Sequence, residues 1–287
     1  MRVLVVGAGG HLGSEVARLA SAAGHDVVGT ATTSSSGWSP LDIRDRSAVS
    51  SLFSAVCPDV VVNTAYRASE WATCADGAAH VALAAAGARL VHVSTDAVHG
   101  GRPDPYGDDE PPTPVYLYGA AKAAGETAVR AIAPTAALVR TSLIIGDERS
   151  KQVTMALELA RGTRRGFLLT DEIRRPIDAA DLAAAILDLA ATDYAGPINI
   201  AGPQDVTRAD LGRAVARAHG LDPAAIPVRT TAESGLGPRP GAIRLDSSRA
   251  YALLPTRIRP VAEALASGPG HQPLAGQREA HRGQGVG

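Results

Sequence analysis

Short runs of branched aliphatic residues alternate with longer alanine-rich stretches along most of this sequence. The run "RVLVV" at 2–6 precedes "HLGSEVARLASAAG" at 11–24, and similar runs recur as "DVVVN" at 59–63 and "ARLVHVST" at 88–95. This alternation predicts parallel strands connected by helices, and hence an α/β fold with a Rossmann-type, doubly wound parallel sheet. Ligands of such sheets bind at the carboxyl ends of the strands, so the residues after each run are the first place to search for a site.

The first apolar run ends in a group of glycines. Gly7, Gly10 and Gly13 stand between the predicted strand and the predicted helix. Glycine lets a backbone approach a pyrophosphate closely, and a helix N-terminus offers unpaired N–H groups to an anion. A glycine triplet alone also fits an ordinary tight turn, but its place between strand and helix favours a dinucleotide-binding loop.

The end of the second predicted strand bears on which dinucleotide is bound. This strand passes through Val27 and Val28 to Thr30 and Ala31, without the Asp or Glu that would hold a ribose 2′-hydroxyl. No arginine stands there to contact a 2′-phosphate either. We therefore expect NADP(H) to be the favoured cofactor, with NAD(H) as the alternative.

One of only two lysines in the chain follows a tyrosine by four places. The two are Lys122 and Lys151, among 28 lysines and arginines in total. On a helix, Tyr118 and Lys122 would share one face. Tyrosine is neutral at pH 7, so an ion pair does not explain the spacing, and a compact ammonium suits ribose hydroxyls better than a guanidinium. We interpret Tyr118 as a proton donor and Lys122 as a cofactor-binding cation. Thr95, at the end of another predicted strand, would hold a substrate carbonyl, although such hydroxyls also serve as helix caps.

Composition limits the other classes of function. The net charge of −1 and the pI of about 6.7 give no broad basic field for nucleic acid or for a membrane surface. Cys57 and Cys74 have neither metal-binding nor redox spacing, which fits a reducing compartment. The opening apolar run is too short for a secretory leader. We expect a cytoplasmic protein without a metal site, whose partner is a small-molecule substrate, and a homodimer is compatible with the sequence.

Further motifs accompany the glycine loop. They are "LDIRD" at 41–45, "PDVVVNTAY" at 58–66, "VHVSTDAVHGG" at 91–101, "PYGDDEPPTP" at 105–114, "YGAAK" at 118–122, "RTSLIIG" at 140–146 and "RRPIDAADLA" at 174–183. Taken jointly, they make the chain from Met1 to about Leu265 resemble the extended short-chain dehydrogenases/reductases of the dTDP-4-dehydrorhamnose reductase type, a sugar-nucleotide-binding family.

The resemblance implies a role for each matching residue. Thr95, Tyr118 and Lys122 would be the catalytic residues. The cofactor would be bound by Gly7, Gly10, His11, Leu12, Gly13, Asp42, Ile43, Thr64, Ala65, Tyr66 and Lys122. Within this set, Asp42 and Ile43 would lie by the adenine, and residues 64–66 would lie near the nicotinamide-side ribose.

The sequence departs from the family pattern at several positions. Ala97-Val98-His99 replaces the usual Tyr-Val-Phe after the Thr-Asp pair, Tyr116 stands where asparagine is usual, and Cys74 lies near another asparagine position. We expect these residues to line the substrate pocket. They leave the identity of the sugar open.

The motifs predict an NAD(P)H-dependent reductase of a keto group, on a nucleotide-linked 4-keto-6-deoxy sugar or a related ketone, with Tyr118 as proton donor. Nucleotide-sugar epimerases and dehydratases share the trio, but the dehydratases carry an Asp-Glu pair after the threonine, where this chain has Asp96-Ala97. A non-catalytic NADP-binding regulatory or accessory protein is the other alternative. The intact Tyr/Lys pair argues against it, because such a protein needs no proton donor.

The chain is expected to have two folded regions and a tail. Residues 1–146 would form the dinucleotide-binding Rossmann domain, to which 174–202 return. Residues 147–173 and 203–266 would form a small C-terminal substrate-binding lobe. The segment 267–287 is rich in glycine and poor in large aliphatic residues, so we expect a disordered tail.

Overall fold

The structure is a computed structural model of the 287-residue chain, and it describes residues 1–33, 37–68 and 70–266. The tail predicted at 267–287 lies outside the described residues.

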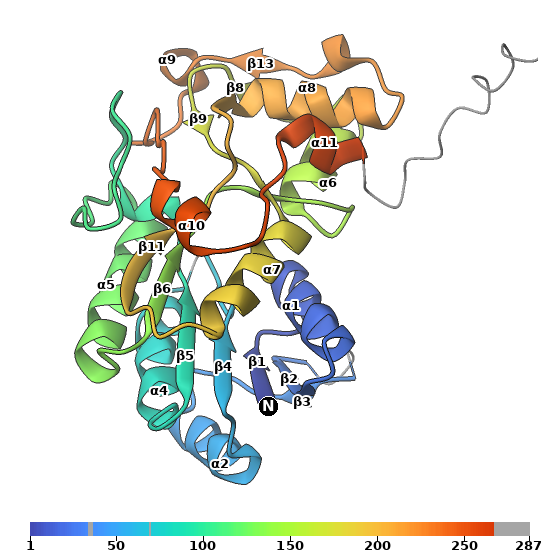
Figure 1. Cartoon of the computed structure of the whole chain (residues 1–287). Helices are drawn as coiled ribbons and strands as arrows, with labels where there is room; N and C mark the ends of the chain where they lie inside the picture. The colour runs from blue at the N-terminus through green and yellow to red at the C-terminus, as the bar shows by residue number, and fades with distance from the viewer. Residues whose placement is uncertain (34–36, 69, 267–287) are drawn as a thin grey trace, which may run out of the picture.

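A seven-stranded parallel sheet forms the centre of the molecule, in the order β11-β6-β5-β4-β1-β2-β3 (Figure 1). Its strands are β1 (Arg2–Val6), β2 (Asp26–Ala31), β3 (Ser39–Pro40), β4 (Val60–Asn63), β5 (Arg89–Val93), β6 (Ala137–Arg140) and β11 (Gly196–Asn199). The chain starts in the middle of the sheet, runs outward through β2 and β3, and then places β4 on the other side of β1. This reversal creates a switch point between β1 and β4, where doubly wound sheets bind their ligands. The predicted α/β class with a Rossmann-type, doubly wound parallel sheet is confirmed.

Helices cover both faces of the sheet because successive strand residues point to opposite faces. Val3 and Val5 pack in one apolar core with α1 and α7, while Leu4 and Val6 pack in a second core with α2, α4 and α5. The helices of this part are α1 (His11–Ala22), α2 (Arg46–Val56), α3 (Trp71–Cys74), α4 (Asp76–Ala84), the 3-10 helix η2 (Asp96–Val98), α5 (Leu117–Ile132) and α7 (Ala179–Ala190).

A second group of elements lies above the sheet in Figure 1. Its largest apolar cluster joins Val153 and Leu157 of α6, Leu211 and Val215 of α8, and Val261 of α11. The elements are β7 (Ile144–Ile145), α6 (Lys151–Ala160), β8 (Leu168–Leu169), β9 (Ile173–Arg174), β10 (Ile177–Asp178), β12 (Val206–Thr207), α8 (Arg208–Ala218), η3 (Pro223–Ala225), β13 (Val228–Arg229), α9 (Thr231–Ser234), α10 (Ser248–Leu253) and α11 (Val261–Ala266). The domain boundaries given above stay a prediction.

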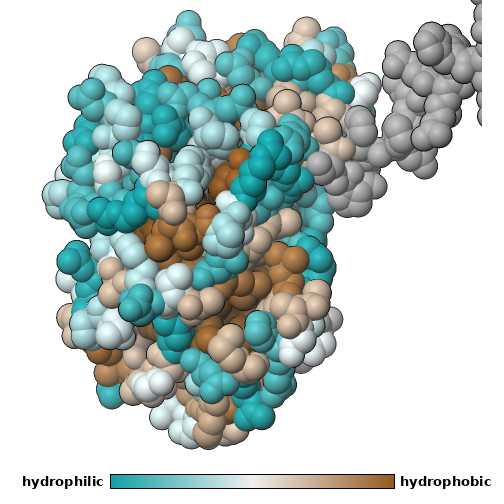
Figure 2. All heavy atoms as spheres, in the orientation of Figure 1, coloured by the Kyte–Doolittle hydropathy of each residue, from teal (hydrophilic) through white to brown (hydrophobic). Residues whose placement is uncertain are grey.

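The surface in this view is hydrophilic at its edges, and hydrophobic residues gather near its middle, around α10 (Figure 2). Tyr251 and Leu253 of that helix are among the exposed large apolar side chains. None of the helices in the described ranges is both long and apolar enough to cross a bilayer.

A buried ion pair fixes α5 against the sheet. Arg140, at the end of β6, donates from Nε and Nη2 to the Glu126 carboxylate at 2.8 to 3.2 Å. Its Nη1 also donates to the carbonyl oxygens of Asp108 and Glu110, at 3.1 and 2.9 Å. The two side chains are only 2% and 3% exposed. Every charge in this contact is therefore paired, and the contact joins a strand, a helix and a loop.

Replacing Arg140 with methionine would leave the Glu126 carboxylate buried without its partner. Breaking a buried pair from one side costs about 3–5 kcal/mol, so we expect the free energy of unfolding, measured by urea titration, to fall by about that amount. The double variant Arg140→Met, Glu126→Leu is the control, and it should be more stable than the single variant because both charges are gone. A loss below about 1 kcal/mol in the single variant would contradict this account.

His99 is a second buried polar residue, and its ring stacks on that of Tyr106 with 4.1 Å between centroids. Neither ring nitrogen has a hydrogen-bond partner within the part of the chain that the structure describes. Burial lowers the pKa of His99 from its ordinary 6.5 to about 4. The ring is therefore neutral at pH 7.

The folded pKa of His99 lies below that of the unfolded chain, so between pH 6.5 and 4 the unfolded chain binds a proton that the folded one does not. The stability that the neutral ring confers is complete above pH 6.5 and is lost as the pH falls, by about 3 kcal/mol at most near pH 4. As the pH falls from about 7.5 to 5, we expect the free energy of unfolding to decrease less in His99→Phe than in the parent. Parallel urea titrations measure the difference, and equal pH dependence in the two proteins would be the contrary result.

Candidate active site

The glycine loop connects β1 to α1 at the switch point of the sheet. Gly7 has a φ angle of 90°, and the Gly10 N–H donates to its carbonyl oxygen at 3.0 Å. A Cβ on Gly7 would lie 2.9 Å from both the Ala65 nitrogen and Thr64 Oγ1, and a Cβ on Gly13 would collide with the Gly7 carbonyl oxygen. Side chains are therefore excluded at Gly7 and Gly13, and the first turn of α1 offers its backbone N–H groups to an anion. The arrangement fits the pyrophosphate of a dinucleotide.

The residues after β4 lie directly against this loop. Thr64 Oγ1 donates to the Val6 carbonyl oxygen at 3.0 Å, and the Ala65 N–H donates to Asn63 Oδ1 at 3.1 Å. Tyr66 follows with 47% of its side chain exposed. The structure thus brings residues 64–66 together with the glycine loop.

Asp42 and Ile43, the two residues predicted to lie by the adenine, differ in the groups that they could present to a cofactor. Asp42 accepts hydrogen bonds from Arg44, which lowers the pKa of Asp42 to about 2. The Ile43 side chain is buried against Gly77, where a Cβ would lie 2.6 Å from Ile43 Cγ1. Only the main chain of Ile43 is therefore left for a cofactor.

His11 and Leu12 occupy the first turn of α1. The Leu12 side chain is buried in the apolar core between α1 and the sheet, so it packs in the core and does not face a cofactor. The His11 ring lies 3.4 Å from the Ile145 carbonyl oxygen and 3.5 Å from Asp147 Oδ1. His11 thus ties the glycine loop to the segment after β7.

Tyr118 lies in the first turn of α5, among aromatic and hydroxyl groups. The ring centroids of Tyr66 and Tyr116 are 6.2 and 6.4 Å from its own. Burial raises the pKa of Tyr118 well above 10, and a hydrogen bond with Thr95 opposes part of this shift. Thr95 Oγ1 also accepts the Ala97 N–H at 3.2 Å, so this hydroxyl caps η2 as well as contacting the phenol.

Lys122 lies one helical turn after Tyr118 and is 2% exposed. Its Nζ donates to the carbonyl oxygen of Val93, the last residue of β5, at 2.6 Å. Burial lowers the pKa of Lys122, and Cys74 and Glu126 partly oppose this effect. Thr95, Tyr118 and Lys122 therefore lie near the carboxyl end of β5.

A cavity of about 310 Å³ lies beside the catalytic candidates on the side of the second group of elements. It is lined by Val115, Tyr116, Leu236, Gly237, Pro238 and Arg239. Tyr116 is 39% exposed there, two residues before Tyr118. The cavity therefore joins the start of α5 to the proline- and glycine-rich segment at 235–241.

Arginines surround two buried carboxylates next to this cavity. Arg239 pairs with Glu172, and Arg208 Nε lies 3.8 Å from the same carboxylate. Arg174 Nε lies 3.5 Å from Asp96 Oδ2. Burial lowers the pKa of Arg208, with Arg174 and Arg239 adding to the effect. Three guanidinium groups thus face two carboxylates, and the surplus positive charge suits an anionic ligand.

The departures from the family pattern were expected to line the substrate pocket, and for most of them this stays a prediction. Ala97, His99 and Cys74 are buried. A Cβ on Gly119 would collide with the Ala97 carbonyl oxygen, so Ala97 packs directly against α5. Of these positions, Tyr116 is the one that lines the cavity beside Arg239.

Sequence reasoning did not identify Glu172, Arg208 or Arg239 as parts of the site. Glu172 and Arg239 are 67 positions apart in the chain. Arginine is frequent here and no spacing singled these residues out. The one available signal was the proline- and glycine-rich composition of the segment that carries Arg239.

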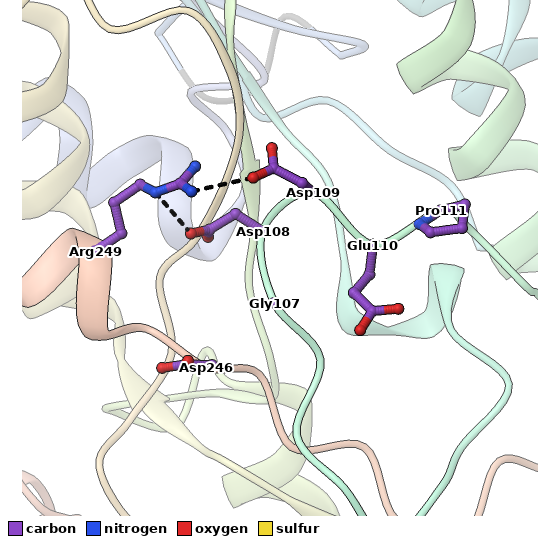
Figure 3. A pocket seen from close by; sticks show the side chains of 7 residues that line it. All are labelled: Gly107, Asp108, Asp109, Glu110, Pro111, Asp246 and Arg249. Atoms are coloured by element: carbon purple, nitrogen blue, oxygen red, sulfur yellow. Dashed lines mark hydrogen bonds and ion pairs between the residues drawn. The ribbon is translucent and has the colours of Figure 1, made fainter.

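A larger cavity of about 490 Å³ contains none of the predicted site residues (Figure 3). Its polar groups already have partners: Arg249 contacts Asp108 and Asp109 at 3.2 and 3.1 Å, and Asp246 accepts the Ser248 N–H. Its lining carries four carboxylates and one guanidinium, so it does not suit an anionic ligand.

Comparisons with known proteins show which family this chain resembles. The family model described as "RmlD substrate binding domain" matches residues 1–268. A dTDP-4-dehydrorhamnose reductase of Mycobacterium tuberculosis (strain ATCC 25618 / H37Rv) is 35% identical over 88% of this chain and 86% of its own. A probable dTDP-4,6-dihydroxy-2-methyloxan-3-one 4-ketoreductase of Streptomyces antibioticus is 33% identical over 84% and 85% of the two chains. The crystal structure of a hypothetical dTDP-4-dehydrorhamnose reductase from Sulfolobus tokodaii is 28% identical, with a TM-score of 0.78 over 89% of this chain and 96% of that one.

The burial of Lys122 predicts that arginine cannot replace it. A guanidinium is larger and planar, and it cannot occupy the space of an ammonium that lies 2.6 Å from the Val93 carbonyl oxygen. We expect Lys122→Arg to lower kcat/KM for ketone reduction by about a hundredfold or more, although the charge is kept. Thermal melting serves as the folding control, and activity within a few-fold of the parent in a folded variant would be contrary to this reading.

Proposed function

Because this chain belongs to the RmlD substrate-binding-domain family of NAD(P)-dependent oxidoreductases, we propose that it uses NADPH to reduce the keto group of a nucleotide-linked 4-keto-6-deoxy sugar or a related ketone. The observation that carries the proposal is the meeting of Thr95, Tyr118 and Lys122 at the end of β5, beside the glycine loop.

Groups of this chain would hold the dinucleotide at its pyrophosphate and at its nicotinamide-side ribose. The backbone of residues 7–13 would bind the pyrophosphate, and Lys122 with residues 64–66 would hold the nicotinamide-side ribose. When bound, the reduced nicotinamide supplies the hydride. NADPH is proposed over NADH because β2 ends in Thr30 and Ala31, without a carboxylate to repel a 2′-phosphate.

Tyr118 would supply the proton to the carbonyl oxygen. Burial raises the pKa of its phenol, so the proton is in place before the reaction begins. As the phenol loses this proton, the Lys122 ammonium would stabilise the phenolate. The Thr95 hydroxyl would donate its one proton to the carbonyl oxygen and so favour the negative charge that develops there.

The substrate would enter from the cavity at Tyr116 and Arg239. The surplus positive charge around Glu172 supports a substrate with a diphosphate, and the relatives at 33% and 35% identity are named for dTDP-linked sugars. The exposed ring of Tyr116 would pack against the sugar or the base.

The test is NADPH oxidation, followed by absorbance, with a panel of keto-sugar nucleotides and simple ketones. Tyr118→Phe is the matched variant, because it removes one hydroxyl and keeps the ring. We expect the parent to reduce a keto-sugar nucleotide with NADPH preferred over NADH, and the variant to lose about a hundredfold or more in kcat while still binding NADPH.

Two results would count against the proposal. If the parent binds NADPH but reduces no ketone of the panel, a regulatory or accessory role is favoured. If Tyr118→Phe keeps its kcat within a few-fold of the parent, the phenol is not the proton donor.

A further inference from the structure

The second of the two lysines also lies at the site. Lys151 is the first residue of α6, and its Nζ lies 5.4 Å from the ring centroid of Tyr66. The Tyr66 ring is in turn 6.2 Å from that of Tyr118. Lys151 is therefore separated from the Tyr118 ring by that of Tyr66.

Arg149 near Lys151 is paired with carboxylates, whereas Lys151 has no carboxylate partner among the described residues. Arg149, two residues earlier, is paired with Glu15 and Asp147 at 2.7 and 2.8 Å. Lys151 is exposed, and within residues 1–33, 37–68 and 70–266 its ammonium has the Tyr66 ring as its one charged or aromatic contact. An exposed cation–π contact contributes only about 0.5–1 kcal/mol, so the ammonium keeps most of its capacity to bind an anion.

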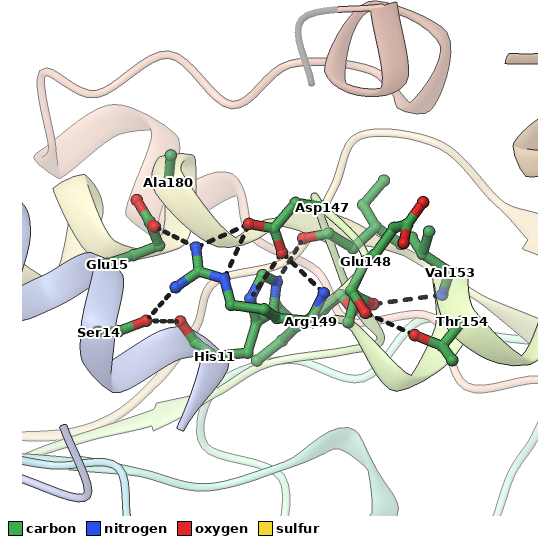
Figure 4. A network of polar contacts seen from close by, with 12 residues as sticks. His11, Ser14, Glu15, Asp147, Glu148, Arg149, Val153, Thr154 and Ala180 are labelled. Atoms are coloured by element: carbon green, nitrogen blue, oxygen red, sulfur yellow. Dashed lines mark hydrogen bonds and ion pairs between the residues drawn. The ribbon is translucent and has the colours of Figure 1, made fainter. Parts of the chain in front are cut away.

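Polar contacts hold the segment before Lys151 against the start of α1 (Figure 4). Arg149 Nη1 donates to Ser14 Oγ at 2.7 Å, while Asp147 faces the His11 ring. Lys151 lies two residues after Arg149, and its ammonium lies over the Tyr66 ring. The segment that carries Lys151 therefore contacts both the start of α1 and the residues after β4.

We propose that Lys151 is a specificity-determining residue that binds a diphosphate group at the mouth of the active site. This inference rests on the proposed function, which brings two diphosphates there, one in the dinucleotide and one in a nucleotide-linked substrate. A lysine ammonium offers three donors to phosphate oxygens, and the aromatic face of Tyr66 holds it in place without neutralising it. On the substrate diphosphate the contact would favour nucleotide-linked ketones over ketones without phosphate, and on the dinucleotide it would favour binding of the cofactor.

Equilibrium binding tests the proposal without depending on turnover. The dissociation constants of NADPH and of thymidine diphosphate, with thymidine as the phosphate-free comparison, are measured at low ionic strength for the parent and for Lys151→Met. Loss of one charged contact to phosphate should weaken thymidine diphosphate or NADPH by about tenfold and leave thymidine unchanged. Lys151→Arg should restore most of the affinity, and added salt should shrink the difference between parent and Lys151→Met.

Arg165→Met is the matched control, since it removes an exposed cation from the loop that follows the same helix. It should bind both ligands within about twofold of the parent. Weakened thymidine diphosphate alone would assign Lys151 to the substrate diphosphate, and weakened NADPH alone would assign it to the cofactor. Unchanged affinity for both in Lys151→Met would overturn the inference while leaving the proposed function intact. A parent that binds neither ligand would overturn the proposed function, and the inference with it.

Discussion

The buried pair between Arg140 and Glu126 is the contact on which the site geometry depends. It attaches α5 to the sheet at the point where β6 ends, and Glu126 lies one turn after Lys122 on the same helix. Two glycines complete the placement: a Cβ on Gly119 or Gly125 would collide with a backbone carbonyl oxygen of the neighbouring segment. Because α5 can approach so closely, the ammonium of Lys122 reaches the end of β5. Charge pairing and small residues together position Tyr118 and Lys122.

The sequence was informative where a local rule governs the structure. Strand residues alternate between two cores, so the valines of "RVLVV" predict a buried central strand, and Val3 and Leu4 do face opposite cores. The glycine loop was predictable because steric exclusion acts within a few residues: Gly13 must be glycine since it packs on the Gly7 carbonyl. The Tyr118 and Lys122 pair was predictable from helical periodicity alone.

The rest of the site depends on contacts between segments far apart in the chain. Arg239 meets Glu172 across 67 positions, and Arg149 meets Ser14 across 135. From the sequence alone, each arginine could pair with many carboxylates. Which carboxylate it contacts depends on the fold. The same limit applies to His99, because its place after the Thr-Asp pair does not predict that its buried ring stacks on that of Tyr106. Lys151 was noticed only for its rarity, and its contact with Tyr66 required the fold.

Two aromatic rings lie near that of Tyr118. Tyr66 and Tyr116 lie at similar distances from it, and burial is the largest cause of the raised pKa of Tyr118. Tyr116 also lines the cavity beside Arg239, at the position where the family usually has asparagine. A large ring narrows this cavity more than an asparagine would. Because the same ring lies near Tyr118 and lines the cavity, we expect a change at position 116 to affect both the size of the cavity and the surroundings of the Tyr118 phenol.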